Sequence, residues 1–158
     1  MAEQQSVITK EMRDQIGKEG PPSTLEVDKT AVRMFARAVG HTDQVFYDEE
    51  EAKRRGYRSL PAPPGYLGTR VYNPKAAQGD GPGSFTRGPY KRILNGGTEI
   101  EYLGDICAGD VLTARSKIAD LSERQGSVGP MLITVSETSY TNQDGKLVAI
   151  SRGTIISY

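Results

Sequence analysis

The sequence predicts an α+β domain whose helices come first and whose antiparallel strands follow. In the first half, apolar residues recur every three or four positions, as at Val32, Phe35 and Ala36, which is the period of a helix with one buried face. From about Ile93 onward, apolar and polar residues alternate, which is typical of strands. This order favours helices segregated to one side of an antiparallel sheet.

Two segments near the N-terminus carry local signals. Ile8, Met12 and Ile16 are spaced four residues apart, so they predict a short, partly flexible helix within residues 1–20. Residues 24–27 alternate between polar and apolar side chains and predict a short strand.

Two further helices are predicted from their capping residues. Asp28 is a good N-cap for a helix over residues 30–39, and Asp48 is a good N-cap for a shorter one that stops at Gly56. Glu51 stands three residues after Asp48, where it would complete a capping box. The apolar face of the first helix comprises Val32, Phe35, Ala36 and Val39.

The proline-rich segment 60–66 separates the helices from the strands. Proline is well tolerated in a first helical turn, so a short helix is expected from about Pro64 to Tyr72. Residues 73–89 then form a long loop rich in glycine and proline. Strands are predicted over residues 98–102, 111–118, 131–140 and 147–158.

Length and composition narrow the classes of function. With 158 residues the chain is expected to form one domain, 1–158. It has 20 basic and 20 acidic residues, which argues against nucleic acid or a membrane surface as its partner. The single cysteine, Cys107, excludes an internal disulfide and is expected to be a packing residue. Because no apolar run is long enough to span a membrane, we expect a cytoplasmic protein.

Several short motifs occur in a fixed order along the chain. They are Phe35-Ala36-Arg37-Ala38-Val39-Gly40, Tyr47-Asp48-Glu49-Glu50-Glu51-Ala52, Gly56-Tyr57, Ala62-Pro63-Pro64, Gly96-Gly97-Thr98-Glu99 and Gly109-Asp110-Val111-Leu112. In this order they resemble the N-terminal MaoC-like dehydratase domains of bacterial acyl dehydratases, over roughly residues 8–158.

The resemblance implies a hot-dog fold, in which a curved antiparallel sheet wraps around a central helix. Such domains work as dimers or pseudo-dimers. They hydrate trans-2-enoyl thioesters or dehydrate (R)-3-hydroxyacyl thioesters carried by coenzyme A or acyl carrier protein. The resemblance implies no metal or redox cofactor.

The catalytic loop of that family is altered in this chain. Active members read Gly-Asp-x-Asn-Pro-x-His-x-Asp and use the first Asp and the His as acid and base. The corresponding loop here is 40–48, with His41 at the Asp position and Phe46 at the His position. Asp43 and Gln44 replace the Asn and the Pro. Phenylalanine has no proton to exchange, so the family's catalytic pair is missing.

Two interpretations of the only histidine stay open. His41 could be a relocated acid or base, paired with Asp43, or a loop residue without a catalytic role. The Gly65 amide could face a thioester or simply begin a tight helix. The candidate substrate-binding residues are Phe46, Tyr47, Ala62, Pro63, Gly65 and Tyr66.

Three hypotheses for function follow from these observations. In the first, the chain is a non-catalytic or substrate-binding subunit of a two-component hydratase or dehydratase of lipid metabolism, and a MaoC-like partner supplies the catalytic Asp and His. In the second, it is a stand-alone hydratase with a relocated site at His41. In the third, it binds an acyl thioester without turnover. We expect the chain to form a homodimer or a heterodimer with that catalytic chain, and only the Phe46 substitution separates the first hypothesis from the second.

Overall fold

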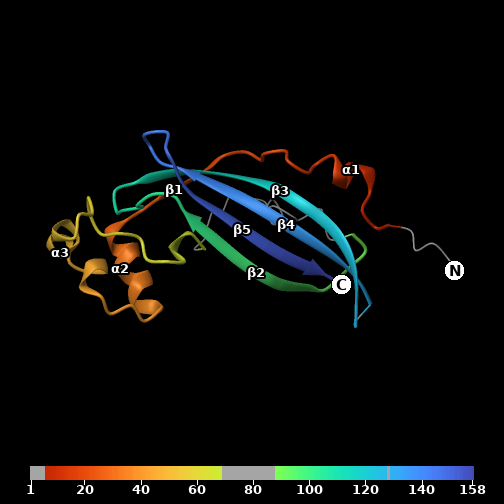
Figure 1. Cartoon of the computed structure of the whole chain (residues 1–158), viewed down its shortest axis with the longest axis horizontal. Helices are drawn as coiled ribbons and strands as arrows, with labels where there is room; N and C mark the ends of the chain where they lie inside the picture. Colours follow the sequence, from red (N-terminus) through yellow and green to blue (C-terminus); the bar gives the residue numbers. More distant parts are fainter. Residues whose placement is uncertain (1–5, 69–87, 128) are drawn as a thin grey trace.

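The computed structural model describes residues 6–68, 88–127 and 129–158 (Figure 1). The helices are α1 (Lys10–Arg13), α2 (Lys29–Ala38) and α3 (Glu49–Arg54), with 3-10 turns η1 (Gln44–Phe46) and η2 (Tyr66–Gly68). The strands are β1 (Ser23–Glu26), β2 (Ile93–Tyr102), β3 (Val111–Gly126), β4 (Gly129–Thr141) and β5 (Leu147–Ser157). The order of helices and strands along the chain confirms the predicted α+β class.

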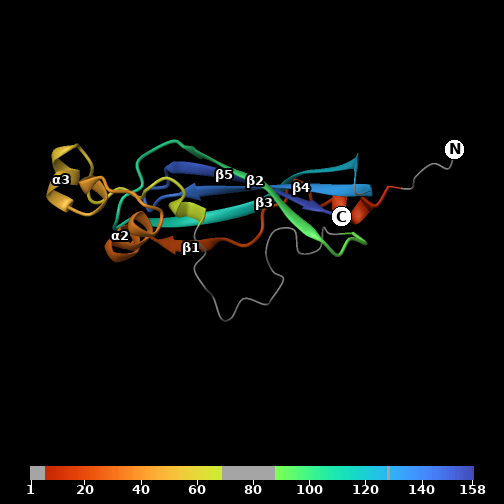
Figure 2. The same ribbon diagram turned by 90° about the horizontal axis from the view of Figure 1, so that it is seen from below.

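The strands form one antiparallel sheet in the order β1-β3-β4-β5-β2 (Figure 1). Register shifts interrupt the pairing at Asn95/Gly97, Ile118/Asp120 and Tyr140/Thr141. Bulges of this kind bend a strand and increase its twist, and Figures 1 and 2 show a long, curved sheet. This curved antiparallel sheet agrees with the expected hot-dog architecture.

The two faces of the sheet have different side chains. Leu112, Ala114 and Tyr140 are buried in the main core on one face. On the opposite face, Glu137 of β4 pairs with Lys117 of β3 at 3.0 Å and with Arg152 of β5 at 2.9 Å. The alternation along each strand therefore separates an apolar core from a charged outer surface.

Helices α2 and α3 gather at one end of the sheet (Figures 1 and 2). The Asp28 carboxylate accepts hydrogen bonds from the Thr30 and Ala31 amides, which confirms it as the N-cap of α2. Val32 and Ala36 are fully buried. The prediction that Val39 shares this buried face is wrong, because Val39 lies just past the last turn and is 51% exposed.

The N-cap of α3 is also confirmed, but its capping box is not. Asp48 accepts hydrogen bonds from the Glu50 and Glu51 amides. The Glu51 carboxylate does not return to the cap; it binds Arg54 and Arg55 near the end of the helix instead. The Asp48 amide donates to the Gln44 carbonyl at 2.8 Å. Glu51 therefore forms ion pairs with the two arginines and not the expected hydrogen bond with the Asp48 amide.

The ends of the helical segments differ from the sequence expectation. Helix α1 is a single turn, and Ile16 lies beyond it, bridged to Ile118 of β3. Ile8 and Met12 are buried in a second apolar cluster with β3 and β4 residues. The expected helix from Pro64 is described only to Gly68, as the turn η2; its remainder and most of the loop 73–89 lie outside the described residues. No helix within the described ranges meets the length and apolarity needed to cross a bilayer.

Candidate functional site

The segment that precedes η2 is fixed to the sheet by an ion pair. The two terminal nitrogens of the Arg58 guanidinium each lie 2.9 Å from one oxygen of the Asp110 carboxylate. Asp110 is 1% exposed and also accepts the Cys107 amide at 2.8 Å. Burial raises the pKa of Asp110, but the hydrogen bonds from Arg58, Cys107 and Gln143 together hold it below its usual value. Arg58 thus anchors the chain just before the proline-rich turn.

Backbone hydrogen bonds also hold the candidate substrate-binding residues that follow Arg58. The Ala62 amide donates to the Ile106 carbonyl at 2.8 Å, and the Tyr66 amide donates to the Pro63 carbonyl at 3.0 Å. Ala62 is partly buried, while Pro63 is almost completely buried. These contacts fix the path of the chain around Gly65.

Gly65 has a backbone conformation that favours glycine. Its φ is +88°, and an added Cβ would lie 3.6 Å from the Phe35 ring. The Gly65 amide donates to the hydroxyl of Tyr102, at the end of β2, over 3.0 Å. No local sequence pattern predicts this contact, because the two residues are 37 positions apart.

Tyr66, next to Gly65, makes an apolar contact with α2. Its ring meets the Phe35 ring edge to face, with centroids 5.7 Å apart and planes at 85°. The residue is 4% exposed, and burial raises the pKa of its hydroxyl. Phe35, on α2, therefore contacts both the turn residue Gly65 and the ring that follows it.

His41, Phe46 and Tyr47 form a second group in the loop after α2. The His41 and Phe46 rings have centroids 5.0 Å apart at 42°. The Tyr47 hydroxyl donates to the His41 carbonyl, and the Tyr47 carbonyl accepts from Arg33 of α2 at 3.0 Å. The imidazole therefore lies beside an apolar ring.

Asp43 is directed to a different partner. Its carboxylate accepts the Val45 amide at 3.0 Å and the Arg55 guanidinium at 2.9 Å. These interactions, first with the Val45 amide and then with Arg55, lower the pKa of Asp43. The carboxylate therefore caps η1 and binds Arg55, the residue that follows α3, instead of forming a dyad with His41.

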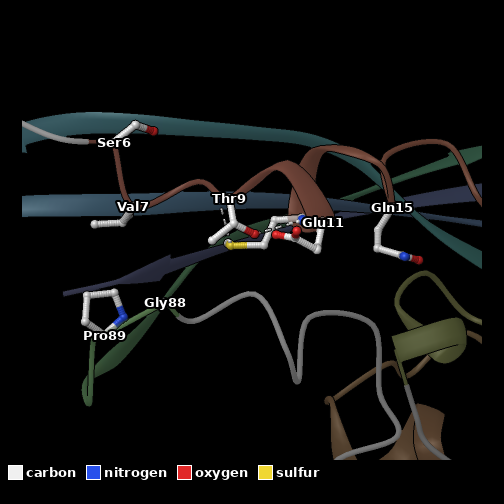
Figure 3. A pocket seen from close by; sticks show the side chains of 8 residues that line it. Ser6, Val7, Thr9, Glu11, Gln15, Gly88 and Pro89 are labelled. Atoms are coloured by element: carbon white, nitrogen blue, oxygen red, sulfur yellow. Dashed lines mark hydrogen bonds between the residues drawn. The ribbon is translucent and has the colours of Figure 1, made fainter.

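Two hollows lie outside these groups. One of about 870 Å³ is beside α1, at the opposite end of the sheet from α2 and α3, and Figure 3 shows its lining side chains. Another, of about 560 Å³, lies between the β1–α2 connection and the start of β3, and Arg33 and Asp110 are among its lining residues. None of the candidate site residues lines either hollow. Within the described ranges, no cluster of three or more His, Cys, Asp or Glu side chains is arranged to hold a metal ion.

Comparisons with known proteins identify relatives in sequence and in fold. Residues 14–151 match the family described as FAS1-like, dehydratase domain region. A UPF0336 protein of Parafrankia sp. (strain EAN1pec) is 31% identical over 135 residues, covering 82% of this chain and 85% of that protein. A protein of Thermomonospora curvata named "Probable enoyl-CoA hydratase alpha subunit" is 23% identical over 143 residues, covering 84% of this chain and 45% of that protein.

Two solved structures from Mycobacterium tuberculosis are similar in fold. One is the C-terminally truncated HadBC (3R-hydroxyacyl-ACP dehydratase) complex, with 29% identity, a TM-score of 0.71, and coverage of 90% of this chain and 97% of that chain. The other is the ChsH1-ChsH2 complex, with 16% identity, a TM-score of 0.75, and coverage of 89% and 84%. A third, a MaoC-like dehydratase from Rhodospirillum rubrum, has 20% identity, a TM-score of 0.62, and coverage of 90% and 92%.

Proposed function

Because the chain belongs to the FAS1-like dehydratase-region family of MaoC-like hot-dog domains, we propose that it is a non-catalytic or substrate-binding subunit of a two-component enzyme. That enzyme would be an enoyl-CoA hydratase or (R)-3-hydroxyacyl-thioester dehydratase. The observation that carries the proposal is the contact between Phe46 and His41, which fills the catalytic loop with an apolar ring and a lone imidazole.

Hydration of an enoyl thioester needs both a proton donor and a proton acceptor near the substrate. Phe46 supplies neither. The hydrogen bonds from the Val45 amide and from Arg55 lower the pKa of Asp43 and favour its ionised form, which makes it a weak proton acceptor. These contacts support a chain in which the acid and base come from a partner.

A second subunit has a suitable place to bind. Strand β2 is ten residues long and forms one edge of the sheet, and of its residues only Ile100 is not exposed. The other edge strand, β1, has four residues. A long exposed edge with large apolar residues such as Ile93 and Leu94 is a template for pairing with another strand. The similarity to the HadBC complex supports a partner chain, and in our proposal a chain of the same fold class binds at this edge.

The substrate in this proposal is an acyl thioester of coenzyme A or acyl carrier protein. Its thioester group would approach the Gly65 turn, which packs on the buried side chains of Tyr66 and Pro63. The groups that hold the turn, Arg58 and Asp110, would position it without touching the substrate.

Co-expression with a MaoC-like chain that keeps the intact Gly-Asp-x-Asn-Pro-x-His loop tests the proposal. We expect a stable heteromer by native mass spectrometry and hydration of crotonyl-coenzyme A by the heteromer, with little or none by this chain alone. The matched control is the same heteromer whose partner lacks its loop Asp and His. Robust turnover by the isolated chain would instead favour a relocated site at His41, and a complex with thioester binding but no turnover would favour a binding module.

A further inference from the structure

The Gly65 amide is already hydrogen-bonded within the chain. Its acceptor, the Tyr102 hydroxyl, comes from the last residue of β2, whose backbone pairs with Ala149 of β5. Tyr102 is 41% exposed, so the contact lies at the protein surface, where a ligand can reach it. A side chain of the sheet edge thus occupies the donor that a thioester carbonyl would need.

The direction of this amide is fixed by its neighbours. Gly65 has a φ of +88° and is bounded by the Phe35 ring, while Tyr66 is bonded back to Pro63. Turning the N–H toward another acceptor would require this whole turn to change. It is simpler for the Tyr102 side chain to move, because its ring lies partly in solvent and can change rotamer.

We infer that the Tyr102 hydroxyl competes with the thioester carbonyl for the Gly65 amide and thereby lowers the affinity for a thioester. This inference rests on the proposed thioester-binding function. One amide has one proton to donate, so a carbonyl can bind there only when the Tyr102 hydroxyl has left. The free energy of thioester binding is therefore less favourable by the free energy of the hydrogen bond between Gly65 and Tyr102.

The size of the effect follows from the usual net stability of such a bond. A hydrogen bond of this type changes an equilibrium constant by about two- to tenfold. Replacing Tyr102 by phenylalanine keeps the ring and removes only the acceptor atom. The Kd for a thioester should therefore fall by about the same two- to tenfold factor.

The test uses the full chain and the Tyr102→Phe variant. The first readout is the ¹⁵N–¹H resonance and hydrogen exchange of the Gly65 amide, which report directly on its acceptor. The second is the Kd for crotonyl-coenzyme A by isothermal titration. We expect the Gly65 resonance to move, its exchange to accelerate, and crotonyl-coenzyme A to bind more tightly. Tyr90→Phe is the matched control, because Tyr90 packs against the second apolar cluster.

Three outcomes would overturn the inference. An unchanged Gly65 resonance would show that the hydroxyl does not hold the amide, and a released amide without tighter binding would show that the two do not compete. Undetectable crotonyl-coenzyme A binding in every variant also counts against it, whereas a stable heteromer that hydrates the thioester would still uphold the proposed function. If Tyr102→Phe loses its fold by circular dichroism, Tyr102→Leu, which also lacks the hydroxyl, provides the same comparison.

Discussion

Arg58 and Asp110 form a bidentate ion pair between positions 52 residues apart, and only the Asp110 carboxylate is buried. Asp110 also binds the Cys107 amide and the Gln143 side chain, which accepts in turn from the Val111 amide. One carboxylate thereby links the segment before the Gly65 turn, the connection between β2 and β3, and the turn between β4 and β5. We therefore expect the stability of the site to depend on this carboxylate.

Removing the Asp110 side chain should destabilise the fold. Asp110→Ala leaves the Cys107 amide and the Arg58 guanidinium without their acceptor. Breaking a buried pair costs about 3–5 kcal/mol, and the lower value applies because Arg58 is exposed to solvent. We expect the free energy of unfolding in urea to fall by about 3 kcal/mol. Asp105→Ala, which removes an exposed carboxylate nearby, should change it by less than about 0.5 kcal/mol.

The same residue should shape the pH dependence of stability. The pKa of Asp110 is lower in the folded chain than in the unfolded chain, so its ionised form stabilises the fold. That contribution is complete above the unfolded pKa of about 3.9 and is lost as the pH falls through the folded value. Unfolding free energies should therefore drop below about pH 4, and drop less steeply in Asp110→Asn. If the unfolding free energy of the unaltered chain and of Asp110→Asn fell equally steeply at acid pH, this assignment would be contradicted.

The exposed edge at β2 should control assembly. Lysine on an edge strand blocks strand pairing, because its charge would have to be buried in the new interface. We expect the unaltered chain to sediment as an assembled species. The double variant Ile93→Lys/Leu94→Lys should sediment as a monomer. Met34→Lys is the control, because Met34 is 67% exposed on α2, away from the strand edge. An assembled double variant would place the interface elsewhere.

The sequence predicted those features whose causes are local. The N-caps Asp28 and Asp48 act on amides two and three residues away, so their side chains alone identify them. The capping role of Glu51 was wrong because Arg54 and Arg55 compete for the same carboxylate. The contact of Tyr102 with Gly65 could not be predicted, because it depends on how the sheet edge meets the proline-rich turn. Long-range register, which fixes such contacts, leaves no local pattern.

The last prediction concerns His41, whose surroundings argue against proton transfer. The ring lies against Phe46, and the nearby carboxylate of Asp43 is bound to Arg55. A positioned acid or base contributes about 10²–10⁴ in rate. If His41 has no such role, His41→Ala in the heteromer should keep hydration of crotonyl-coenzyme A within about threefold, which is far smaller than that contribution. Loss of the partner's loop Asp or His should instead lower kcat by about 10² or more. A comparable loss in His41→Ala, with the heteromer intact by native mass spectrometry, would place the acid or base on this chain.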